Sequence, residues 1–160
     1  IIPSYDGKGL LNFFEARDIT NTSSLRYLKP MVDKNDVIAL ELFINWKKPI
    51  ILCEGAFDMM AIKRNAIPIL GKYIQPHLQL KIIKHGVKDI YIALDKDAIK
   101  DSINIIQDFL RNEMNVYFVE LTDKDPSKLG FKNSWKLIKE SKKINFKDLI
   151  EMKLDVKEII

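Results

Sequence analysis

The chain has 160 residues, of which 47% are hydrophobic and 30% are charged, a composition typical of one folded domain that excludes general disorder. A single cysteine, Cys53, excludes an intramolecular disulfide and a zinc site built from cysteines, and it fits a reducing compartment. We find no signal peptide and no apolar run near the about 18 residues that span a bilayer, and the start at Ile1 predicts a fragment of a longer protein.

The net charge of +4 comes from the end of the chain. Residues 128–160 contain nine lysines and five acidic residues, whereas residues 1–127 contain 17 residues of each sign. A lysine-rich helical end with a solvated face accounts for this excess, and a surface that faces nucleic acid is the alternative.

The first part of the chain is predicted to form a β-hairpin. Residues 1–5 and 10–16 are apolar and aromatic, and a glycine-containing turn at residues 6–9 separates them. These glycines lack the spacing of a P-loop, so a P-loop ATPase is not supported. Apolar residues near helical spacing predict a helix over residues 35–48.

The middle of the chain alternates short apolar runs with amphipathic segments. Strands are predicted at residues 49–53, 67–70, 89–94 and 115–121, and helices at residues 57–64, 76–85 and 99–114. Wholly apolar strands are typical of a parallel sheet buried on both faces. The pattern therefore predicts an α/β fold with a parallel sheet of about four strands flanked by helices. Two further helices are predicted in the tail, at residues 134–142 and 146–153.

Acidic side chains follow three of the predicted strands. They are Glu54 after the first strand, Asp95 and Asp97 after the third, and Asp123 and Asp125 after the fourth. Asp58 comes one helical turn after Glu54 and can face the same place. Ligands of open parallel sheets bind beyond the carboxyl ends of the strands.

A preference of Asp and Glu for loops and helix starts explains any one of these acids alone. Three acidic strand ends at one sheet edge would repel one another unless a cation neutralised them. Oxygen ligands without a nearby His or Cys suit Mg²⁺ or Mn²⁺. The sequence therefore predicts a site for one of these ions.

Three segments match a family pattern, namely ILCEGAFD at residues 51–58, LDKD at 94–97 and DKDP at 123–126. They resemble the TOPRIM domain, which primases, topoisomerases, some nucleases and recombination proteins share. The segments LNFFEARDI at 11–19 and RYLKP at 26–30 are similar to the stretch that leads into this domain in bacterial and phage DNA primases. The resemblance covers roughly residues 1–130.

The chain departs from the primase pattern at a few positions. Ala16 stands where the family usually has Gly, Arg26 where Lys is usual, and Ser127 where an acid is frequent. Ala98-Ile99 stands where Ala-Gly is usual. These differences lead us to expect a diverged, phage-encoded member.

The resemblance implies three regions and an activity. Residues 1–48 would end an N-terminal subdomain, residues 49–130 would form the TOPRIM domain, and residues 131–160 a lysine-rich helical tail. The implied enzyme is a nucleotidyltransferase that synthesises short RNA primers from ribonucleoside triphosphates on single-stranded DNA. A replicative helicase is the expected protein partner, no membrane is involved, and the expected location is the cytoplasm, that of a host if the protein is phage-encoded.

The resemblance also implies roles for single residues. Glu54, Asp95 and Asp97 would be catalytic, with Asp95 and Asp97 as direct Mg²⁺ or Mn²⁺ ligands and Glu54 as either a ligand or a proton-transfer group. Asp123 and Asp125 would complete the metal site. Asp58 would lie next to the ligands and support them without binding the metal itself. Template or triphosphate phosphates would be contacted by Arg17, Arg26, Lys29 and Lys72.

Other functions use the same acids. A TOPRIM nuclease or an RNA-maturation enzyme would have water as the nucleophile, but it has no need of the primase-like segments at Arg17 and residues 26–30. A non-catalytic nucleic-acid-binding or recombination accessory module is disfavoured by the intact Glu54, Asp95 and Asp97. A receiver domain would place its pair of acids after the first strand.

Overall fold

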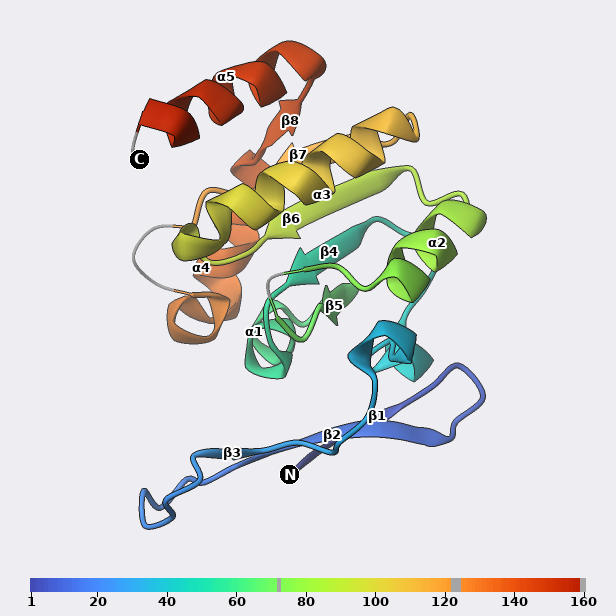
Figure 1. Cartoon of the computed structure of the whole chain (residues 1–160), viewed down its shortest axis with the longest axis vertical. Coiled ribbons are helices and arrows are strands. Elements are labelled where there is room, and N and C mark those ends of the chain that lie inside the picture. The colour runs from blue at the N-terminus through green and yellow to red at the C-terminus, as the bar shows by residue number, and fades with distance from the viewer. Residues whose placement is uncertain (72, 122–124, 159–160) are drawn as a thin grey trace.

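The computed structural model describes residues 1–71, 73–121 and 125–158, which form two sheets and the helices around them (Figure 1). The larger sheet has the strand order β5-β4-β6-β7-β8. Its strands are β4 (Ile50–Cys53), β5 (Ala66–Pro68), β6 (Asp89–Ala93), β7 (Asn115–Phe118) and β8 (Lys142–Ile144). The first four run parallel and β8 runs antiparallel at the edge. The predicted α/β class with about four parallel strands is confirmed.

Helices cover both faces of the larger sheet. They are α1 (Ala56–Ile62), α2 (Pro76–Lys84), α3 (Ile99–Arg111), α4 (Pro126–Glu140) and α5 (Phe146–Glu158). Ile50 and Leu52 of β4 point into a core with α2, α3 and α5, whereas Ile51 and Cys53 point into a core with α1 and α4. Because successive strand residues face opposite sides, a strand between two helix layers has to be apolar throughout.

The hairpin prediction is confirmed. β1 (Ile2–Tyr5) pairs antiparallel with β2 (Leu11–Arg17), and the short β3 (Tyr27–Leu28) extends this hairpin sheet on the other side of β2. The register places Arg17 opposite Tyr27. In Figure 1 the hairpin sheet lies below the larger sheet, as a separate layer.

The helix predicted over residues 35–48 is wrong. This stretch contains two short 3-10 turns, η1 (Lys34–Asp36) and η2 (Glu41–Phe43), and the four residues 37–40 between them are all buried. A surface helix buries only one of its faces, so four consecutive buried residues do not fit a surface helix. The backbone N–H of Leu40 donates to Ser4 Oγ at 2.8 Å, and Asn12 Nδ2 donates to the carbonyl of Ile38 at 3.0 Å. The segment therefore ties the hairpin sheet to the larger sheet.

The tail differs from the prediction in two respects. Helix α4 begins at Pro126 rather than at Ser134, and Gly130 kinks it with a φ of 72°. The sequence did not predict β8, which pairs with β7 through residues 142–144. The last predicted helix is present as α5.

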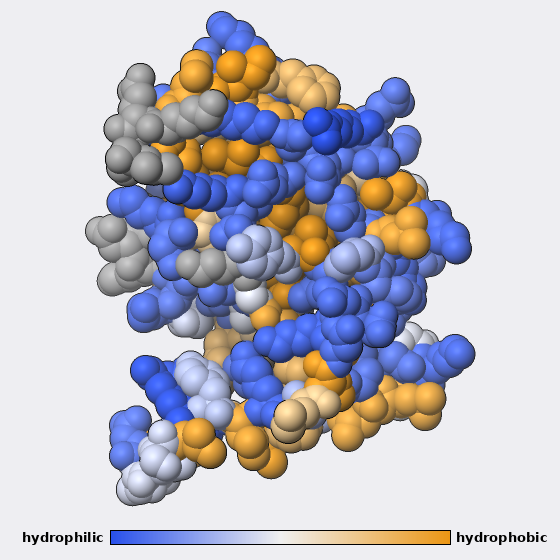
Figure 2. All heavy atoms as spheres, in the orientation of Figure 1, coloured by the Kyte–Doolittle hydropathy of each residue, from blue (hydrophilic) through white to orange (hydrophobic). Residues whose placement is uncertain are grey.

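The face of the molecule shown in Figure 2 is mostly hydrophilic, with apolar side chains along the hairpin sheet at the bottom of the view. Leu10, Leu11 and Leu28 of this region are exposed. None of the helices in the described ranges is long and apolar enough to cross a membrane.

Candidate active site

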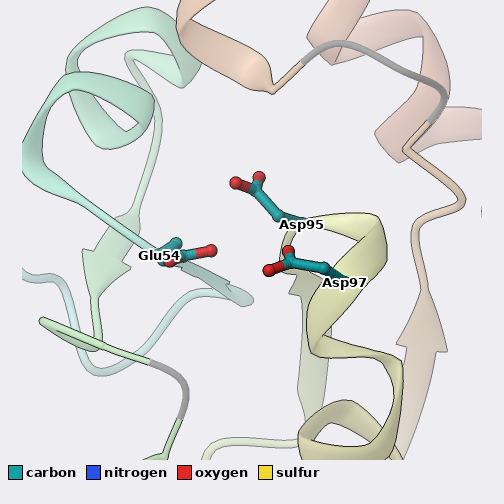
Figure 3. A group of neighbouring side chains, drawn as sticks. All are labelled: Glu54, Asp95 and Asp97. Atoms are coloured by element: carbon teal, nitrogen blue, oxygen red, sulfur yellow. The ribbon is translucent and has the colours of Figure 1, made fainter.

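Three carboxylates meet at the carboxyl ends of β4 and β6. Glu54 follows β4, Asp95 lies just beyond β6, and Asp97 lies in the 3-10 turn η3 (Lys96–Ala98). One oxygen of each lies within 4.8 Å of the other two, and the side chains point toward a common space (Figure 3). β4 and β6 are neighbours with Cys53 beside Ala93, so the parallel register brings the two strand ends together.

The turn after Asp95 completes the group. The N–H of Ala98 donates to the carbonyl of Asp95 at 2.9 Å, so the chain turns back within η3. The 3-10 turn, rather than an extended segment, therefore places Asp97 beside Asp95.

Burial and like charge act together on Asp95. Burial raises the pKa of the Asp95 carboxyl above its usual range, and a hydrogen bond with Glu54 partly offsets this rise. The charges of Asp125 and Asp97 raise the pKa further. Oδ1 of Asp95 is buried and has no hydrogen-bond partner among the described residues. A buried oxygen in this state is suited to a cation, because a bound ion offsets the loss of water.

Asp58 lies outside the group of three and joins two loops. Its side chain is buried, with Oδ2 accepting from the N–H of Gly55 at 3.2 Å and Oδ1 accepting from the N–H of Ser127 at 3.1 Å. Burial raises the pKa of Asp58, and these two N–H donors partly offset the rise. Asp58 thus connects the turn after β4 to the start of α4.

Asp125 is engaged at the start of α4. Its Oδ1 accepts from the N–H of Lys128 and from Ser127 Oγ, and its Oδ2 forms an ion pair with Lys128 Nζ at 2.9 Å. Burial acts to raise the pKa of Asp125, but hydrogen bonds from Lys128 and Ser127 outweigh it and hold the pKa below the usual value. Asp125 does not belong to the group within 4.8 Å.

A groove of about 570 Å³ brings the acids and predicted basic residues together. Glu54, Asp95 and Asp125 line it on the side of the larger sheet. Arg17, Arg26 and Lys29 line it on the side of the hairpin sheet. Predicted residues from both sheets therefore share one site.

Comparisons with solved structures place this arrangement in a known fold. The zinc-binding and RNA polymerase domains of the Aquifex aeolicus primase match with 25% identity and a TM-score of 0.72, over 89% of this chain and 40% of that one. The RNA polymerase domain of Mycobacterium tuberculosis primase DnaG, in complex with a double-stranded DNA oligomer with a 6-nucleotide overhang, matches with 16% identity and a TM-score of 0.68. That match covers 94% of this chain and 54% of that one.

The chain has the fold of the bacterial primase RNA polymerase domain. It spans 40% of the Aquifex chain and about half, 54%, of the Mycobacterium chain. No family model matches the sequence, and no curated protein matches it.

The hairpin wall of this primase fold contains residues that sequence reasoning missed. The Arg17 guanidinium lies over the ring of Tyr27 at 5.5 Å and over the ring of Phe57 at 5.2 Å, so it bridges the hairpin sheet and α1. Lys29 Nζ forms an ion pair with Oε2 of the buried Glu15 at 2.9 Å. Strand alternation is a signal for Glu15, since it lies on the same face of β2 as Arg17.

Asp123 and Lys72 lie outside the described residues. Cys53 is fully buried in β4, and burial raises the pKa of its thiol well above the usual range. Such a thiol is inert, in agreement with its prediction as a buried strand residue.

Proposed function

We propose that this chain is the metal-binding catalytic region of a DNA primase, which synthesises short RNA primers on single-stranded DNA. The observation that carries the proposal is the group of Glu54, Asp95 and Asp97 within 4.8 Å, two of which, Glu54 and Asp95, line a groove together with Arg17 and Arg26. A carboxylate group facing basic residues suits a reaction in which anionic phosphates must be held near divalent metal. The primase fold supports the same assignment.

The donor atoms of the site fit Mg²⁺ or Mn²⁺. All are carboxylate oxygens, and the buried Oδ1 of Asp95 offers a ligand position that the described residues leave open. We assign Asp95 and Asp97 as direct ligands and Glu54 as a ligand or proton-transfer group at the primer 3′-hydroxyl. Asp125 and Asp123 are assigned to complete the site, and Asp58 to hold the two loops together. A bound ion would lower the pKa of the attacking hydroxyl and neutralise phosphate charge.

The residues of the hairpin wall would position the substrates. In the reaction, the 3′-hydroxyl oxygen bonds to the α-phosphorus of a ribonucleoside triphosphate, and its proton passes to Glu54 or to solvent. The bond between the α-phosphorus and the bridging oxygen breaks, and pyrophosphate leaves. Arg17, Arg26 and Lys29 face the acids across the groove, where they can hold template or triphosphate phosphates. Lys72 is assigned to the same task. The Mycobacterium domain was solved with DNA, which supports a nucleic-acid partner for this chain as well.

We extend the proposal to the type of domain, the protein partner and the cellular location. We assign a TOPRIM identity to the sheet region, a replicative helicase as protein partner, and a cytoplasmic location. A phage origin would place the protein in the cytoplasm of a host cell. The departures from the primase pattern at Ala16 and Arg26 support this origin.

Primer synthesis from labelled ribonucleotides tests the proposal. The full-length protein should make short RNA on single-stranded DNA with Mg²⁺ or Mn²⁺, and Asp95→Ala or Asp97→Ala should each lower synthesis at least about 100-fold. Asp155→Ala, which removes an exposed carboxylate on α5, should leave synthesis unchanged. Metal-dependent cleavage of nucleic acid without synthesis would identify a nuclease and contradict the proposal.

A further inference from the structure

Lys128 places a positive charge inside the acidic end of the groove. Its Nζ lies 2.9 Å from Oδ2 of Asp125, and its backbone N–H donates to Oδ1 of the same carboxylate at 2.9 Å. Lys128 lines the groove together with Glu54 and Asp95. The ligand atoms that Asp125 could offer to a metal ion are therefore already engaged by one lysine.

The ammonium group of Lys128 interacts with several carboxylates. A hydrogen bond with Asp125 raises the pKa of Lys128, and the charges of Asp125, Asp95 and Asp58 raise it further. In turn, Lys128 lowers the pKa of Asp95 and so favours its ionised form. The lysine thus supplies part of the positive charge that clustered carboxylates require.

We propose that Lys128 is a resident counter-cation of the acidic site and competes with a divalent ion for the carboxylate of Asp125. The inference rests on the proposed metal site and extends it. A metal ion that takes Asp125 as a ligand has to displace the ammonium group of Lys128. The site then binds metal more weakly than the same carboxylates would without Lys128, and the Lys128 side chain accounts for the difference.

A second lysine of α4 provides a matched control. Lys136 lies 4.0 Å from Glu140 in an ion pair, and its side chain is 71% exposed, close to the 67% of Lys128. Lys136 does not line the groove. The two lysines therefore share a helix, a similar exposure and an intrahelical acidic partner, and they differ in proximity to the acidic site.

Binding of Mn²⁺ to the full chain measures the competition directly. The electron paramagnetic resonance signal of free Mn²⁺ gives the dissociation constant at neutral pH and low ionic strength. Lys128→Met should bind Mn²⁺ about 1.5- to fivefold more tightly, the range expected when an exposed ion pair is lost as a competitor. Lys136→Met should bind Mn²⁺ like the unaltered chain.

A double-mutant cycle separates competition for Asp125 from a general effect of charge. In an Asp125→Asn background, Lys128→Met should no longer tighten Mn²⁺ binding, because the contested carboxylate is absent. An equal tightening in that background, or no tightening in the original one, overturns the inference and leaves the metal site standing. Unchanged Mn²⁺ binding in Asp95→Asn plus Asp97→Asn overturns the metal site itself, and this inference with it.

Discussion

At the scale of single residues, the carboxyl groups of Asp95 and Asp58 in the acidic site are partly or fully buried and also lie close to other carboxylates. Burial raises the pKa of both Asp95 and Asp58, and each also feels the charge of a neighbouring carboxylate. Without a cation, ionised Asp95 therefore opposes folding at neutral pH. Sites that bind metal commonly have this property, since the arrangement serves the ligand rather than the stability of the free protein.

Asp95→Asn should stabilise the metal-free protein at neutral pH. The pKa of Asp95 is higher in the folded than in the unfolded chain, so its penalty is present at neutral pH and disappears as the pH falls through the folded pKa. Thermal unfolding in a chelator at pH 7 should therefore show a higher midpoint for Asp95→Asn than for the unaltered chain. The increase in the unfolding midpoint should become smaller as the pH is lowered below 7.

Asp148→Asn provides a control of opposite sign. Lys142 holds the pKa of Asp148 below its usual value, so the charge of Asp148 favours folding above the unfolded pKa, and this contribution is lost as the pH falls through the folded pKa. The Asp148 variant should therefore lower the midpoint at pH 7. A lower midpoint in Asp95→Asn as well would show that the acidic site is not under electrostatic strain.

The sequence predicted the acids of the site but not their neighbours. Glu54, Asp95 and Asp97 could be placed because each follows a buried parallel strand, and the strand ends share one sheet edge. Glu15 lies on the same strand face as Arg17, and Lys128 lies three residues after Asp125, but their ion pairs were not predicted. An ion pair also depends on where its two side chains point after folding.

At the scale of elements, apolar patterns located the four parallel strands of the larger sheet and failed in the connection before it. Strand β4 is buried at every residue and is continuously apolar, and β6 is apolar from Ile90 to Ala93. Residues 37–40 are equally apolar, but they cross between two sheets without regular structure. The three residues of β8 include two exposed lysines, so no apolar pattern indicated that strand.

The end of α1 offers a stabilising substitution. Lys63 is exposed and adopts a left-handed conformation with a φ of 54° directly after the helix, where glycine is favoured. Lys63→Gly should raise the free energy of unfolding by about 0.5–1 kcal/mol, measured by urea denaturation. Lys84→Gly, at the exposed last residue of α2, should lower it by about the same amount. A loss in both variants would exclude the left-handed cap.

At the scale of the whole molecule, the two walls of the groove belong to different sheets. A small apolar cluster of Phe13, Val37, Ala39 and Leu70 lies between the hairpin sheet and the larger sheet, apart from the two main cores. The acids are held by the larger sheet alone, whereas Arg17 and Arg26 depend on the hairpin sheet. Packing of this cluster therefore sets the distance across the groove.

Phe13→Ala should uncouple the two walls. Binding of Mn²⁺ should stay within about twofold, because the distant carboxylates keep their supports. Affinity for single-stranded DNA should fall about tenfold or more, because the basic side chains are misplaced relative to the acids. Titration with labelled oligonucleotide and with Mn²⁺ measures both. Phe13→Leu should retain DNA binding, and equal loss of both ligands in Phe13→Ala would contradict separate support of the walls.

The two edge strands of the larger sheet affect how readily copies of the protein associate at high concentration. β5 ends in Pro68, which has no N–H to offer, and the three-residue β8 exposes Lys142 and Lys143. Short strands, proline and lysine at sheet edges discourage pairing with strands of another molecule. We expect the protein to resist edge-to-edge aggregation at the concentrations needed for crystallisation or NMR.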